Sequence, residues 1–149
     1  MPARTLLRFW VPPLLWTGVI LAASFDLFSA AHTAPWLADL LRLLVGHPLP
    51  EPRFEQMHWI VRKSAHITEY AILSALLFRA LRAEQVPRWK AVWVAISIAV
   101  CLAVGSLDEW HQSFVPSRGS SPWDVLLDGT GAALAQGMIR TVQVLFFRR

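Results

Sequence analysis

The run AVWVAISIAVCLAVGSL, residues 91–107, contains no charged side chain, and DEWHQSFVPSRGSSPWDVLLD, residues 108–128, follows it directly. An apolar run of about this length is typical of a helix that crosses a membrane. The polar run holds four carboxylic acids and leads into a second apolar segment, which begins near Pro122. Two apolar segments are therefore joined by the densest polar stretch of the chain, so the fold and the candidate site have to be considered together.

The composition is that of a membrane protein with a single domain, residues 1–149. Hydrophobic residues make up 55% of the chain and charged residues 16%, whereas a typical globular domain has about 25% charged residues. Most of the eight tryptophans lie near the ends of apolar segments, as expected at bilayer interfaces. The basic residues are dispersed beside these segments, which indicates membrane topology and excludes nucleic acid as a partner. Cys101 is the single cysteine, so we expect a buried thiol and no internal disulfide.

Four membrane-spanning helices are predicted, at about residues 11–27, 59–81, 91–108 and 122–145. Pro12 and Pro13 are expected in the first turn of the first helix, where N–H groups have no intrahelical partner. A cleaved signal peptide is the alternative for this segment, because basic residues and an apolar core precede Ala22-Ala23-Ser24. Small residues in the fourth segment would let neighbouring helices approach closely. They are Gly129, Gly131, Ala132, Ala133, Ala135 and Gly137.

The basic residues predict the orientation of these four helices. With the N-terminus inside, nine basic residues are cytoplasmic and five are external, which favours two cytoplasmic termini. The cytoplasmic group is Arg4, Arg8, Arg79, Arg82, Arg88, Lys90, Arg140, Arg148 and Arg149, and the external group is Arg42, Arg53, Arg62, Lys63 and Arg118. Every acidic residue except Glu84 then lies on, or dips in from, the external side.

A further short helix is predicted in the first external loop. In PWLADLLRLLVG, residues 35–46, the apolar residues recur with the spacing of one helix face. Pro35 suits the start of this helix and Gly46 its end, while Asp39 and Arg42 would face water. The helix either lies on the outer membrane surface or packs on the bundle. The predicted fold is thus all-α, an integral membrane four-helix bundle with an extra amphipathic helix.

Polar side chains within the predicted helices should meet at the external surface. Side chains three or four residues apart share one face of a helix. This spacing relates residues in the second helix, at the end of the third and at the start of the fourth, with Arg118 in the turn between the last two. The candidate binding residues are Lys63, His66, Glu69, Tyr70, Asp108, Glu109, His111, Gln112, Arg118, Asp124 and Asp128.

Three interpretations of these residues remain open. They form a polar network that holds the helices together, a metal site, or a site for proton relay or anion binding that uses Arg62, Lys63 and Arg118. For a divalent metal such as Zn or Mn, the candidate ligands are His66, Glu69, Asp108, His111, Asp124 and Asp128. No other cofactor is indicated, and no motif of a serine or cysteine nucleophile is present.

Two stretches, RKSAHITEYAILSALLFRAL (Arg62–Leu81) and DEWHQSFVPSRGSSPWDVLLDGTGA (Asp108–Ala132), resemble the VanZ-like family of integral membrane proteins. The family motif falls on the candidate binding residues except His111, and also on Pro116. Ser117 replaces the usual glycine of the turn. The resemblance implies a multi-pass protein of the bacterial cytoplasmic (inner) membrane. It also implies a link to the cell envelope, since the namesake is associated with resistance to the glycopeptide teicoplanin.

Three classes of function follow. The first is binding of an amphiphilic envelope molecule, such as a membrane lipid headgroup, a lipid-linked cell-wall precursor or a lipoglycopeptide. The second is a membrane-embedded enzyme that acts on a lipid-linked phosphate, with His66 or Glu69 as the acid or base and the aspartates binding metal. The third is a structural or accessory subunit. Binding is the leading hypothesis, because cationic, acidic and aromatic groups meet at headgroup depth without a complete catalytic signature.

Overall fold

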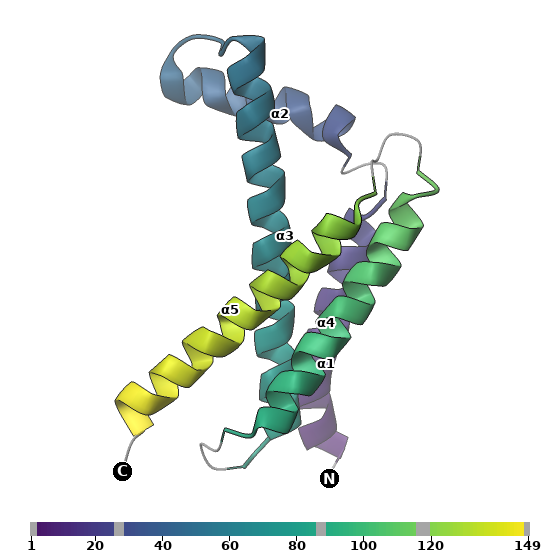
Figure 1. The fold of residues 1–149 in the computed structure, drawn as a ribbon, viewed down its shortest axis with the longest axis vertical. Coiled ribbons are helices and arrows are strands. Elements are labelled where there is room, and N and C mark those ends of the chain that lie inside the picture. The colour runs from purple at the N-terminus through teal and green to yellow at the C-terminus, as the bar shows by residue number, and fades with distance from the viewer. Residues whose placement is uncertain (1–2, 26–28, 86–88, 116–119, 148–149) are drawn as a thin grey trace.

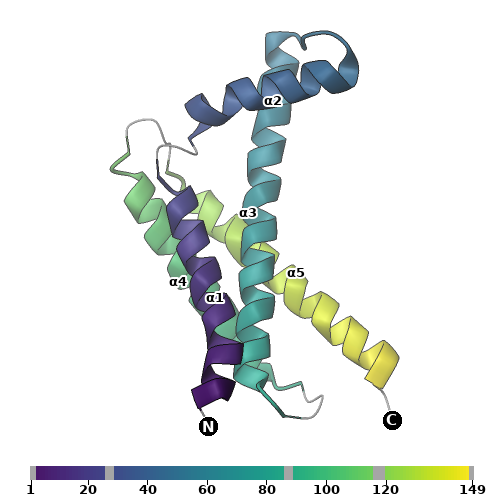
Figure 2. The ribbon, with the colours of Figure 1, turned by 180° about the vertical axis from the view of Figure 1, so that it is seen from behind.

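The computed structural model describes residues 3–25, 29–85, 89–115 and 120–147, and within these ranges it is all-helical (Figure 1). Four long helices run alternately in opposite directions, so that both ends of the chain lie at the same end of the molecule. A fifth helix crosses near the opposite end, as the view from behind also shows (Figure 2). In chain order the helices are α1 (Ala3–Ala23), α2 (Ala30–Val45), α3 (Glu51–Arg82), α4 (Ala91–Gln112) and α5 (Pro122–Phe147).

Two of the described helices are long and apolar enough to cross a membrane. They are α1 from Arg4 to Ala23, with a mean hydropathy of 1.5, and α4, with a mean hydropathy of 2.0. The other two long helices, α3 and α5, carry charged residues of the candidate site, and so does the end of α4. The all-α prediction is confirmed, and the structure adds that the polar helices are the ones that meet at the centre of the molecule.

The prediction for the start of α1 was wrong. The helix begins at Ala3, so Pro12 and Pro13 lie in its interior and not in its first turn. Each proline removes one backbone hydrogen bond, and such a loss has to be compensated by packing. The turn before the prolines is held by Phe9, which is buried with Ala80 of α3 and Ala83.

Both α3 and α4 extend beyond the segments predicted from the sequence. The 32 residues of α3 make a helix about 48 Å long, which exceeds the ~30 Å hydrocarbon thickness of a bilayer. Its first residues project beyond the other long helices and contact α2 (Figure 1). At the other extension, α4 continues to Gln112, so its acidic residues are helical and have fixed positions.

The extra helix α2 is present, and its end was predicted correctly. Gly46 terminates it with φ 83°, a left-handed conformation that suits glycine, and its N–H bonds to the carbonyl of Arg42. The helix begins at Ala30, so Pro35 lies inside it and does not start it. Trp36 is 81% exposed and Leu44 is 71% exposed. These apolar side chains therefore do not pack on the bundle.

A hydrogen bond connects α2 to the projecting part of α3. The Thr33 hydroxyl lies 3.2 Å from Nε2 of His58. Burial and the nearby charge of Arg62 both lower the pKa of His58, which favours a neutral imidazole at this contact.

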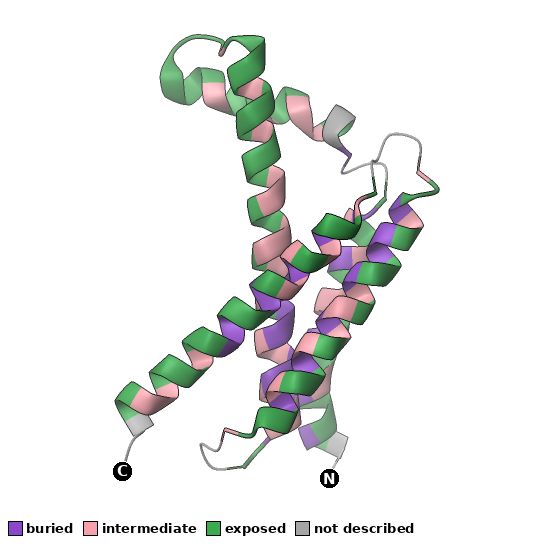
Figure 3. Ribbon diagram, viewed as in Figure 1, coloured by how far each residue is buried: buried purple, intermediate pink, exposed green. Residues whose placement is uncertain are grey.

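The helix α5 crosses α3 with almost no space between the two backbones. A Cβ atom at Gly131 would lie 2.3 Å from the carbonyl oxygen of Ile67, so no larger residue fits there. Buried residues concentrate along this crossing and against α4 (Figure 3). Below the glycine, the Gln136 amide donates to the Ser74 hydroxyl over 2.7 Å, and this hydroxyl donates to the Ala132 carbonyl over 3.1 Å. Buried polar groups therefore reinforce the glycine contact.

The helix crossing can be tested with two glycines of α5. We expect Gly131→Ala to force α5 away from α3 and to lower the free energy of unfolding by about 1–3 kcal/mol, the usual cost of overpacking. Gly137 has no atom within 4 Å of an added Cβ, so Gly137→Ala is the matched control and should leave stability unchanged or raise it. Thermal unfolding in detergent measures both changes. Equal behaviour of the two variants would contradict the proposed tight crossing.

Candidate functional site

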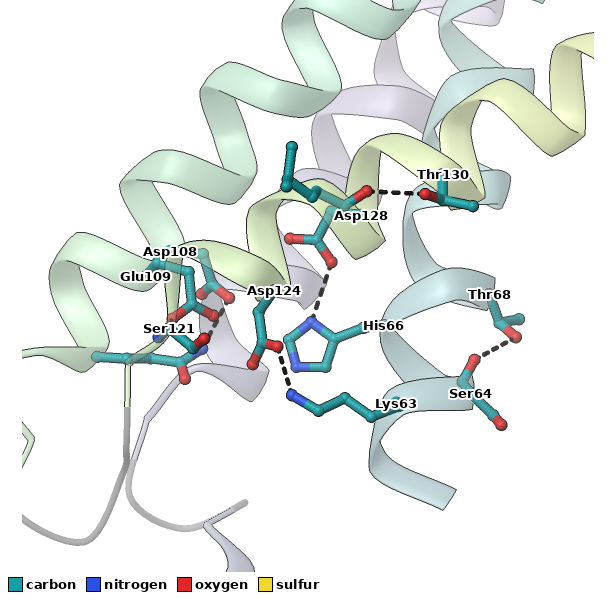
Figure 4. Close-up of polar contacts among 12 residues, drawn as sticks. Lys63, Ser64, His66, Thr68, Asp108, Glu109, Ser121, Asp124, Asp128 and Thr130 are labelled. Carbon is teal, nitrogen blue, oxygen red and sulfur yellow. Dashed lines mark hydrogen bonds and ion pairs between the residues drawn. The ribbon is translucent and has the colours of Figure 1, made fainter. Parts of the chain in front are cut away.

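Two residues of α3 pair with two residues of α5 close to the glycine contact (Figure 4). Lys63 forms an ion pair with Asp124, and Nδ1 of His66 lies 3.1 Å from Oδ1 of Asp128. The lysine and histidine are three residues apart and the aspartates four apart, so each pair of side chains shares one helix face. The sequence spacing predicted these faces, and the structure brings them together.

Asp128 lies at the junction of α3, α4 and α5, and none of its surface is exposed. On the α4 side its carboxylate faces Gly105, where an added Cβ would lie 2.7 Å from Oδ2. A larger residue at position 105 would therefore displace the carboxylate. Glycine at this position is needed for the close approach of Asp128, and hydropathy alone did not indicate it.

The acidic end of α4 is buried beside these pairs. Asp108 is 2% exposed, and its Oδ2 accepts a 2.8 Å hydrogen bond from the Gln112 amide one turn later. Glu109 is 6% exposed, and its Oε2 accepts a 2.7 Å hydrogen bond from the backbone N–H of Ser121. The glutamate therefore fixes the residue that precedes α5, and so helps to position Asp124.

Several buried carboxylate oxygens receive no hydrogen bond from the described residues. They are Oδ1 of Asp108, Oε1 of Glu109 and Oδ2 of Asp128. A buried acceptor without a donor costs about 1–3 kcal/mol, and more when it is charged. Within the described residues, the region holds five carboxyl groups and two Lys or Arg side chains, Arg62 and Lys63. The arrangement therefore favours an added proton, cation or hydrogen-bond donor.

A cavity of about 150 Å³ lies beside the acids, between α1, α3 and α4. Its polar lining consists of Ser24, Arg62, His66, Glu69, Asp108 and Gln112. Ile20, Ala23 and Ala65 supply the apolar part of the lining. One guanidinium group and two carboxyl groups thus face the same small space.

The other predicted site residues are distributed around this cavity. Lys63, Glu109, Asp124 and Asp128 form the adjacent layer described above. Tyr70 belongs to the core cluster and is fully buried. His111 faces α1, with its Nδ1 3.2 Å from the Ser24 hydroxyl. Arg118, like the neighbouring Pro116 and Ser117, lies outside the described residues.

Two contributions of α1 were missed in the sequence. Ser24 lines the cavity and binds His111, although in the sequence it fitted a signal-peptide cleavage motif. Trp16 donates its indole N–H to the backbone carbonyl of Glu69 over 2.9 Å. In the sequence, the only signs of these contacts were the indole N–H of Trp16 within an apolar segment and the hydroxyl of Ser24 at the end of that segment. Neither sign identified the helix that the residue contacts.

The geometry of the described residues does not support the metal site proposed from the sequence, and the candidate ligands remain a prediction. Among the described residues, no group of three or more His, Cys, Asp or Glu side chains is arranged to hold a metal ion. The two imidazoles of the predicted pairs have different partners, since His66 binds Asp128 and His111 binds Ser24.

The pairing of α3 with α5 can be tested by a double-mutant cycle on Lys63→Met and Asp124→Asn. Each single change leaves one partly buried charge unpaired, so we expect the two effects on unfolding free energy to be non-additive by about 0.5–3 kcal/mol. The control cycle combines Lys63→Met with Asp39→Asn on the exposed face of α2 and should be additive. Additive effects for Lys63 and Asp124 in thermal unfolding would contradict an energetic role for this ion pair.

Comparison with known proteins supports the motif assignment. The family model described as VanZ/LLP1 matches residues 9–146 and therefore covers the candidate site and most of each of the four long helices. Comparisons with curated proteins and with solved structures returned no significant match. From this match over nearly its whole length, the chain belongs to the VanZ/LLP1 family.

Proposed function

We propose that the chain is an integral protein of the bacterial inner membrane, with α1, α3, α4 and α5 crossing the bilayer. The proposal is supported by the hydropathy of α1 and α4 and by the family assignment. Both chain ends lie at one end of the bundle, and the excess of basic residues predicts that this end is cytoplasmic. The cavity and the buried acids then belong to the external half of the bundle.

The helix α2 has a place in this topology. Its exposed Trp36 and Leu44 suit a helix that lies in the bilayer interface, where an apolar face is covered by lipid. The projecting start of α3 carries α2 at the external end of the bundle.

Reporter fusions test the topology. We expect a reporter after Arg149 to be active only in the cytoplasm and a reporter near Gly46 to be active only outside, because the basic residues retain the chain termini inside. Paired reporters that are active on opposite sides of the membrane provide the measurement. A C-terminal reporter found outside would reverse the orientation and place the cavity near the cytoplasm.

We propose that the function is binding of an amphiphilic cell-envelope molecule through its polar headgroup. The single observation that carries this proposal is the cavity in which Arg62 faces the same space as Glu69 and Asp108. Ionisable side chains inside a membrane segment are costly, so their presence there favours a functional site. A headgroup can enter such a cavity while its acyl chains remain in the bilayer.

The second candidate is a structural subunit whose polar residues only hold its helices together. It is favoured by the pairs between α3 and α5, Lys63 with Asp124 and His66 with Asp128. These contacts join two helices. The Oδ1 atom of Asp108, in contrast, receives no hydrogen bond from a described residue. The structural function therefore accounts for the α3–α5 pairs and leaves the cavity unexplained.

Filling the cavity tests the binding proposal. We expect Ala65→Phe, on the cavity wall, to abolish saturable binding of envelope lipids, because the added ring occupies the space of a headgroup. Ala95→Phe, at an exposed position of α4 away from the cavity, is the control and should bind as the wild type does. Native mass spectrometry of the purified chain, titrated with a bacterial lipid extract, measures the bound lipid. Equal binding by a folded Ala65→Phe variant would contradict the proposed site.

A further inference from the structure

We propose that the cavity between α1, α3 and α4 selects a headgroup of the phosphoethanolamine type, with its phosphate at Arg62 and its primary ammonium group at Asp108. This inference rests on the proposed binding function and specifies the ligand class. It follows from the size of the cavity, from the hydrogen bonds that its walls lack and from the absence of aromatic rings in its described lining.

The volume of the cavity restricts the ligand to a small headgroup. The cavity has a volume of about 150 Å³. Pockets for drug-sized ligands have volumes of about 300–1,000 Å³. A lipoglycopeptide or the sugar-peptide portion of a cell-wall precursor is too large to be enclosed in this space. A phosphate joined to a two-carbon amine is of suitable size.

Asp108 provides the site for the ammonium group. The side chain is 2% exposed, and Gln112 already donates to its Oδ2. Its Oδ1 is buried beside the cavity and receives no hydrogen bond from a described residue. A primary ammonium carries three N–H donors and one positive charge. It would therefore supply both the missing hydrogen bond and part of the missing positive charge.

Arg62 provides the site for the phosphate. Its guanidinium forms no hydrogen bond or ion pair with another described residue, although Glu69 and Asp108 line the same cavity. A guanidinium group binds phosphate oxygens through two parallel hydrogen bonds. Arg62 lies on the external side of His66 along α3, so in the proposed topology the phosphate is nearer the aqueous surface than His66.

The same walls discriminate against a choline headgroup. A trimethylammonium group has no N–H to donate, so the Oδ1 atom of Asp108 would remain without a partner. Quaternary ammonium ligands are usually bound by cages of aromatic rings. The described lining of the cavity contains no Phe, Tyr or Trp. The site therefore requires a primary amine and not merely a positive charge.

The wild-type chain tests this selectivity without any substitution. The purified full-length protein is titrated with dioctanoyl phosphatidylethanolamine, phosphatidylcholine and phosphatidylglycerol, which differ only in their headgroups, and native mass spectrometry gives each Kd. We expect phosphatidylethanolamine to bind at least about tenfold more tightly than the other two. Equal affinity for phosphatidylcholine would overturn the ammonium assignment.

Charge-removing variants locate the two ends of the headgroup. Asp108→Asn should remove the preference for phosphatidylethanolamine, because the amide can supply donors at Asp108 but carries no negative charge. Arg62→Gln should weaken the binding of all three phospholipids. Asp39→Asn and Arg53→Gln, at exposed positions outside the cavity, are the matched controls and should leave every Kd unchanged. An unaltered lipid preference in a folded Asp108→Asn variant would overturn the proposal.

A soluble competitor separates the two sources of this headgroup. Competition by O-phosphoethanolamine at the same concentration as the lipid supports a free ligand, whereas much weaker competition supports the intact lipid. The selectivity can also fail independently of the proposed function. Lipid binding could be abolished by Ala65→Phe and yet not depend on the headgroup amine. That result would reject the phosphoethanolamine site and retain the proposed lipid binding. Absence of saturable binding for every lipid would reject both.

Discussion

The crossing of α5 over α3 is the contact on which the rest of the structure depends. At Gly131 the two backbones are so close that even a methyl group would collide with the carbonyl of Ile67. Because the backbones meet, short side chains such as Asp124 and Asp128 can reach partners on α3. The fold therefore places carboxyl groups in a deeply buried position. The crossing is stable only if these groups pair with Lys63 and His66.

Features with a one-dimensional signal could be predicted from the sequence. The uncharged run of residues 91–107 predicted α4. Gly46 predicted the end of α2, which it terminates in the left-handed conformation. The spacing of Lys63 and His66 predicted a shared face, since helix periodicity is local. The resemblance to the VanZ-like family came from two short polar stretches, and the VanZ/LLP1 match extends it to residues 9–146.

Features that depend on a partner helix could not be predicted in this way. Pro12 and Pro13 indicated a helix start. The helix already begins before them, because Phe9 packs against Ala80, which is distant in the sequence. His111 shares a helix face with Asp108, yet its imidazole binds Ser24 of the turn after α1. Periodicity defines which side chains share a face, and only the packing of helices determines which faces meet.

Buried acceptors without a donor among the described residues occur in both parts of the buried polar region, and the one that lies beside the cavity argues for a ligand. The α3–α5 pairs and the contact of Gln136 with Ser74 join helices through partners within the chain, although Oδ2 of Asp128 and Oε1 of Gln136 lack a donor among the described residues. On the α4 side, Asp108 and Glu109 each keep one buried carboxylate oxygen without a donor among the described residues. A network that served stability alone would gain from apolar residues at such positions, because a half-satisfied buried charge is worse than a packed side chain. For Asp108 this cost falls beside the cavity, where a ligand that carries N–H donors would remove it.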